Sequence, residues 1–69
     1  MNVQKLRGVM AEKGMTQKLL AKRMNMSERT MQLRLKQGRF GTDEAEKIGY
    51  ILDMDKPTLV EIFLPFKSL

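Results

Sequence analysis

In this chain of 69 residues, the side chains best suited to a function are the lysines and arginines, which can bind polyanions. Histidine and cysteine are both absent, which removes the commonest general base and the usual ligands of structural zinc. We therefore expect no catalytic residues, no metal site, no cofactor and no small-molecule substrate. Positive charge is abundant, since 13 Lys and Arg outnumber 8 Asp and Glu and give a net charge of +5. Such a chain favours nucleic acid or an anionic membrane surface as its partner.

The charge is divided unevenly along the sequence. Residues 1–41 carry ten basic and two acidic side chains, a net charge of +8, whereas residues 42–69 carry three basic and six acidic ones, a net charge of −3. We expect one face of the fold to be positive and the opposite end to be acidic. A charge excess alone is also typical of an ordinary solvated surface.

The length leaves room for a single domain, residues 1–69, around one core. No apolar run approaches the ~18 residues that a membrane span requires. The N-terminus also lacks the apolar stretch of a signal peptide. These observations predict a cytoplasmic protein with no membrane partner.

Capping residues and apolar spacing predict an all-α fold of five helices. The expected N-caps of the first four helices are Asn2, Thr16, Ser27 and either Gly41 or Thr42. Pro57 is expected in the first turn of a fifth helix. Residues 59–64 are also compatible with a terminal strand, because β-branched and aromatic residues are frequent there.

The second and third helices are separated by only three residues, 25–27. This is the connection of a helix-turn-helix unit, which spans residues 17–36. So tight a corner needs a small residue where the helices cross, and Ala21 occupies that position. Because the unit lies in the positive half of the chain, spacing and charge together favour DNA binding over an ordinary helical hairpin.

The order of these motifs resembles a known family. The motifs are Thr16-Gln17, Ala21, Ser27-Glu28-Arg29-Thr30, the turn at residues 35–38 and the helix at residues 44–52. Together they are similar to the Cro/cI repressor type of helix-turn-helix domain, also called the XRE family, over residues 3–63. The resemblance implies a compact, five-helix, lambda-repressor-like domain of a phage, prophage or bacterial regulator that binds operator DNA as a symmetric dimer. Asn25 departs from the common turn glycine, and Arg34 departs from a frequent apolar residue.

The resemblance and the helical spacing together select candidate DNA contacts. Gln17 is similar to the family's phosphate-contacting glutamine, and the third helix is expected to enter the major groove. The candidate base contacts are Ser27, Glu28, Arg29, Gln32 and Leu33. The candidate phosphate contacts are Gln17, Lys18, Lys36 and Arg39.

Three residues on or beside the third helix have structural alternatives. Ser27 is suited to a helix cap as well as to a base contact. Glu28 is suited to the positive end of the helix dipole or to a pair with Arg29. Arg34 is suited either to a phosphate or to a contact within the protein.

The C-terminal segment, residues 56–69, holds more apolar residues than one short helix can bury. We expect it to form a homodimer interface through Leu59, Ile62, Phe63 and Phe66, or to fold back as a lid over the core. One recognition helix reads only a few base pairs, which favours a dimer on a palindromic operator. The alternative function is a protein-interaction module, such as an antitoxin or an anti-repressor, that uses this apolar segment.

Overall fold

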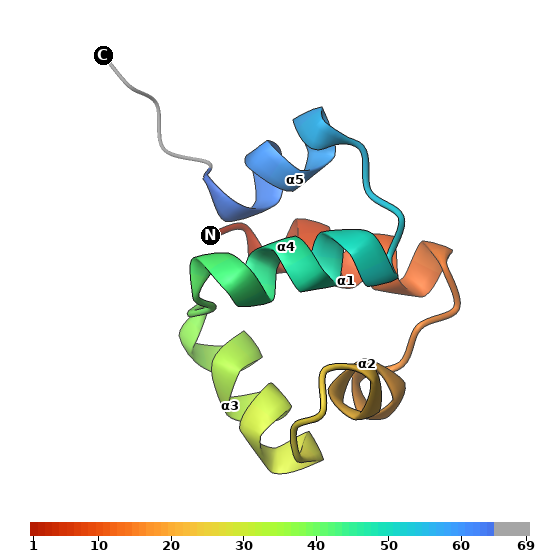
Figure 1. Ribbon diagram of the computed structural model, residues 1–69, viewed down its shortest axis with the longest axis vertical. Coiled ribbons are helices and arrows are strands. Elements are labelled where there is room, and N and C mark those ends of the chain that lie inside the picture. Colours follow the sequence, from red (N-terminus) through yellow and green to blue (C-terminus); the bar gives the residue numbers. More distant parts are fainter. Residues whose placement is uncertain (65–69) are drawn as a thin grey trace.

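Residues 1–64, the part of the chain that the computed structural model describes, contain five α-helices and no strand (Figure 1). In chain order the helices are α1 (Val3–Glu12), α2 (Gln17–Arg23), α3 (Glu28–Gln37), α4 (Thr42–Ile51) and α5 (Lys56–Phe63). In Figure 1, α2 and α3 lie at one end of the molecule and α5 at the other, with α1 and α4 between them. The all-α prediction is confirmed. The alternative strand is wrong, because a capping aspartate and Pro57 begin a helix that runs through residues 59–63.

Most helices begin at a side chain that accepts a hydrogen bond from the third backbone N–H of the helix. The N-caps of this kind are Asn2, Thr16, Ser27 and Asp55, with N···O distances of 2.9–3.0 Å. Gly41 is the N-cap of α4, and its own N–H donates to the Glu44 carboxylate at 2.9 Å. The first three side-chain caps and Gly41 agree with the prediction, whereas Asp55 was not predicted as a cap.

The helix ends depend on residues that tolerate a left-handed backbone. Asn25 has φ 57° and follows Met24, the C-cap of α2, at the corner between α2 and α3. Asparagine accepts this conformation better than most residues, so the replacement of the usual glycine is accommodated. Gly38, at φ 65°, ends α3 in the same way. The turns therefore set the direction in which α3 leaves α2 and approaches α4.

The core draws on every helix. Its ten buried hydrophobic residues are Leu6, Met10, Leu20, Ala21, Met24, Met31, Leu35, Ile48, Leu52 and Ile62. Ala21 is buried in α2, as the tight corner requires. Leu19, the residue before Leu20 in α2, is 38% exposed. Ile62 is fully buried, so its prediction as a dimer contact is wrong, because its side chain completes the core of one molecule.

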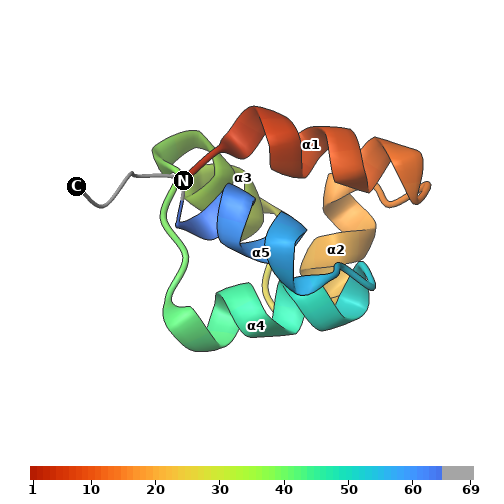
Figure 2. The same cartoon turned by 90° about the horizontal axis from the view of Figure 1, so that it is seen from above.

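α5 covers the core between α1 and α4, as Figure 2 shows from above. The Asn2 N–H donates to the Ile62 carbonyl at 2.7 Å, and Lys5 Nζ lies 3.1 Å from Glu61 Oε1. On the other side, α5 packs closely on α4, because a Cβ added to Gly49 would lie 2.7 Å from a methyl group of Leu59. α5 is therefore a lid over the core, with its outer side left exposed.

Candidate nucleic-acid interface

The corner between α2 and α3 holds α3 by one side. Met31 and Leu35 are buried on the inner side of α3, and Leu20 and Ala21 are buried in α2. The Met26 N–H donates to the Ala21 carbonyl at 2.9 Å and closes the corner. With its inner side anchored in this way, α3 presents its opposite side to solvent.

Five residues line an open hollow along the exposed side of α3. They are Glu28, Arg29, Gln32, Leu33 and Lys36, and all five are exposed. Their spacing follows the 3.6-residue period of one helix face. The structure thus brings together four candidate base contacts and one candidate phosphate contact. We call these five residues the α3 outer face.

The charges on the α3 outer face are not neutralised by neighbouring residues. Within residues 1–64, the two ion pairs are Lys5–Glu61 and Arg34–Glu44. The alternative in which Glu28 pairs with Arg29 is therefore not formed. Arg29 and Lys36 remain available for an anionic ligand.

Ser27 has a structural role at the start of α3. Its Oγ accepts from the Thr30 N–H at 3.0 Å and donates to Thr30 Oγ1 at 2.9 Å. A base contact by Ser27 would compete with these bonds. The hydroxyl of Ser27 is thus occupied as a cap, and it does not line the α3 outer face.

The remaining candidate phosphate contacts lie on neighbouring segments. Gln17 and Lys18 are the first two residues of α2, where Gln17 is partly buried and Lys18 is exposed. Arg39 is exposed and directly follows the residue that ends α3. These side chains come from two different segments outside α3, which is how a protein fixes its register on a DNA backbone.

Arg34 points away from this set. Its guanidinium donates to Glu44 of α4, so the contact within the protein is the alternative that the structure contains. A contact of Arg34 within the protein was one of the predicted alternatives, but the sequence did not identify Glu44 as its partner. The spacing from Gly41 to Glu44 is that of a capping box. This spacing could have predicted the bond between Glu44 and the Gly41 N–H. It could not have predicted the bond between Glu44 and Arg34, ten residues earlier.

A family model for the Cro/C1-type HTH DNA-binding domain matches residues 5–62. The chain belongs to this family. As a Cro/C1-type domain it is a DNA-binding helix-turn-helix protein with double-stranded DNA as its partner. No curated protein and no solved structure matches the chain. None of the helices in residues 1–64 has the length and apolar character needed to cross a membrane.

Proposed function

We propose that this Cro/C1-type domain is a sequence-specific transcriptional regulator that reads the major groove with α3. The α3 outer face supports this proposal, because it gathers four chemically different base-reading side chains. Arginine can bind guanine and glutamine can bind adenine through two hydrogen bonds, a carboxylate can accept from cytosine, and leucine can contact the thymine methyl. Occupancy of an operator would block or recruit RNA polymerase, with no chemical step by the protein.

Affinity would come from basic and polar groups around the α3 outer face. We assign phosphate contacts to Gln17, Lys18, Lys36 and Arg39. Three of these side chains are exposed and Gln17 is partly buried at the start of α2. Such contacts position a protein on the duplex without reading its sequence.

The proposal includes a homodimer on a palindromic operator. α3 has ten residues and reads only a few base pairs, so a second copy is needed for useful specificity. With Ile62 buried, the apolar surface of α5 consists of Val60 and Leu64, which are 46% and 55% exposed, together with the predicted contacts Leu59 and Phe63. These four residues line an apolar hollow beside α4. Phe66 lies outside the described residues and stays a predicted contact.

The experiment that tests this function is the selection of bound sequences from a random duplex library, followed by fluorescence titration over a salt series. We expect a palindromic consensus with half-sites about one helical turn apart. The logarithm of the binding constant should fall linearly with the logarithm of the salt concentration, by about 0.9 per neutralised phosphate. Sedimentation of the complex should show two protein chains per duplex.

Two variants of equal charge separate base reading from general electrostatics. Arg29→Ala removes a bidentate base contact worth about 1–3 kcal/mol, or roughly 5- to 150-fold in affinity for the consensus duplex. Lys47→Ala removes one positive charge from α4, where the side chain is exposed and has no ion-pair partner in residues 1–64. We expect Lys47→Ala to retain the preference for the consensus. A library that yields no consensus, with equal losses in the two variants, contradicts sequence-specific reading.

The exposed apolar surface of α5 also favours the second candidate, a protein-interaction module. In that case the library would yield no consensus sequence, and charge reversal at Arg29 would leave binding to the partner protein intact. Replacement of the exposed Val60 and Leu64 by serine, which leaves the buried Ile62 in the core, would weaken that binding. Consensus selection with loss at Arg29 excludes this candidate as the principal function.

A further inference from the structure

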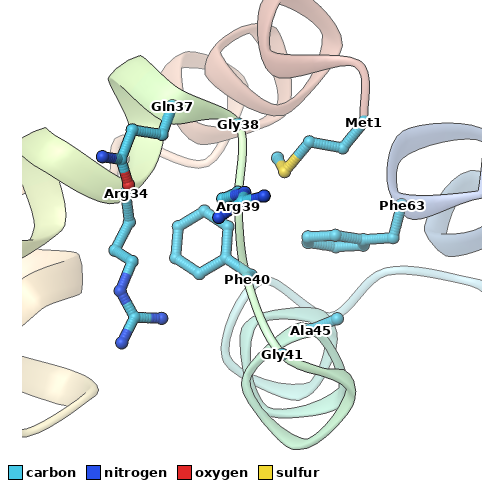
Figure 3. A pocket seen from close by; sticks show the side chains of 9 residues that line it. All are labelled: Met1, Arg34, Gln37, Gly38, Arg39, Phe40, Gly41, Ala45 and Phe63. Carbon is cyan, nitrogen blue, oxygen red and sulfur yellow. The ribbon is translucent and has the colours of Figure 1, made fainter.

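Arg34 and Glu44 join the last turn of α3 to the first turn of α4. Arg34 Nη1 donates to Glu44 Oε1, and the two side chains are 35% and 27% exposed. Figure 3 shows the Arg34 side chain extending from α3 alongside the ring of Phe40. The pair is thus partly shielded from water, where an ion pair is screened less than at a fully exposed site.

Glu44 fixes two chain segments with one oxygen atom. The Oε1 that accepts from Arg34 also accepts from the Gly41 N–H at 2.9 Å. Arg34 is held from its backbone as well, because its carbonyl accepts from the Arg39 N–H at 3.1 Å. The segment between α3 and α4, which carries Arg39, is therefore tied at both of its ends.

The other contacts of α3 lie at its start, where the Met26 N–H closes the corner with α2, and on its buried inner side. Met31 and Leu35 anchor the helix through apolar burial, which has no preferred direction. A charge-assisted hydrogen bond to a guanidinium has a defined geometry. The Arg34–Glu44 pair adds this directional contact next to Leu33 on the recognition helix.

From this arrangement we propose that Glu44 is a positioning residue for DNA reading. Acting through Arg34, it sets the orientation of the C-terminal half of α3 and the position of Arg39, and thereby the preference for the operator over other DNA. The inference rests on the proposed reading of DNA by α3, and it adds a residue of α4 that touches no base or phosphate.

Glu44→Gln separates positioning from folding and from charge. The glutamine carbonyl can still accept from the Gly41 N–H, because Glu and Gln both complete a capping box, but it lacks the charge that holds Arg34. The substitution also makes the net charge more positive, which by itself strengthens binding to any duplex. Glu46→Gln is the matched control, since Glu46 is an exposed residue of the same helix with no ion pair in residues 1–64.

The readout is the ratio of affinities for the selected consensus duplex and a scrambled duplex of equal length. We expect Glu44→Gln to lower this ratio about fivefold, a coupling typical of residues in direct contact. Glu46→Gln should change both affinities by the same factor and leave the ratio unaltered. In an Arg34→Met background, Glu44→Gln should have no further effect on the ratio, because its route to α3 is already removed.

Circular dichroism and thermal unfolding establish that each variant is folded at the temperature of the titration. If Glu44→Gln does not fold, Arg34→Met alone tests the inference, since it removes the same pair and should lower the same ratio. Ratios unchanged from wild type in folded Glu44→Gln and Arg34→Met would overturn the positioning role, while the wild-type consensus would leave the proposed function standing. A wild type that prefers neither duplex would instead refute the proposed function itself.

Discussion

Leu33 is a large hydrophobic residue that α3 exposes to solvent. It is 52% exposed, between Gln32 and Arg34 on α3. Burial of a whole leucine side chain is worth about 1.5–3 kcal/mol. About half of that gain is still available to a DNA contact. Leu33→Ala should therefore weaken binding to the consensus duplex by about 1 kcal/mol, or roughly fivefold.

The partner of Leu33 can be tested by replacing each thymine of the consensus in turn with deoxyuridine. This replacement removes only the C5 methyl group, worth about 0.8 kcal/mol or roughly fourfold when it is fully buried in a contact. For the wild type we expect that loss at one position in each half-site. Leu33→Ala should bind the thymine and deoxyuridine duplexes equally at that position. If Leu33→Ala discriminates the two bases as well as the wild type does, the assignment of Leu33 to a thymine methyl is refuted.

Stability measurements on Leu33→Ala show whether a loss of DNA binding comes from unfolding of the variant. Because Leu33 is half exposed, its truncation should change the free energy of unfolding by no more than about 0.5 kcal/mol. Leu35, two residues further along α3, is 1% exposed. Leu35→Ala should cost about 2–5 kcal/mol. Urea unfolding of the two variants distinguishes the outer side of α3 from its inner side.

Three further predictions concern the fold. Ile62→Ala should lower the free energy of unfolding in urea by about 2–5 kcal/mol, since Ile62 is fully buried; a loss below 1 kcal/mol would contradict its place in the core. Gly8→Ala should stabilise α1 by up to about 1 kcal/mol in thermal unfolding, because open space surrounds Gly8, whereas Gly49→Ala should gain less or destabilise because Leu59 must move. The side chain and N–H of Thr58 hold the pKa of Asp55 below its ordinary value of 3.8, so Asp55 should stabilise the fold above that value and lose this effect as the pH falls through the lowered pKa. The Tm difference between wild type and Asp55→Ala should accordingly shrink in acid, and a difference independent of pH would refute the role of the charged cap.

The helix caps were predictable from the sequence because each depends only on residues close together in the chain. Asn2, Thr16 and Ser27 each accept from an N–H three residues away, so their caps need no tertiary contact. The cap of α5 was missed because Asp53 and Asp55 are both suitable in type. Asp53 instead takes a left-handed backbone at φ 52°, which leaves the cap to Asp55.

Features that depend on packing could not be predicted in the same way. α5 is apolar on several sides, so its sequence does not distinguish the buried Ile62 from the exposed Val60. Arg34 and Glu44 are ten residues apart and meet only because the turn after α3 brings α4 back towards it. The α3 outer face was predictable, because Met31 and Leu35 identify the inner side and helical geometry then determines the outer one.

The division of charge along the molecule predicts how it approaches DNA. Residues 1–41, which form α1, α2 and α3, have a net charge of +8, and residues 42–69, which include α4 and α5, have −3, with α2 and α3 at one end of the molecule and α5 at the other (Figure 1). We expect the field of a DNA duplex to attract the α2–α3 end and to repel the α5 end, which would orient the protein as it approaches the duplex. The ion pairs occupy Lys5 and Arg34 in holding helices together. Lys18, Arg29, Lys36 and Arg39, the basic side chains that we propose as DNA contacts, have no ion-pair partner in residues 1–64, so we expect them to pair with the duplex.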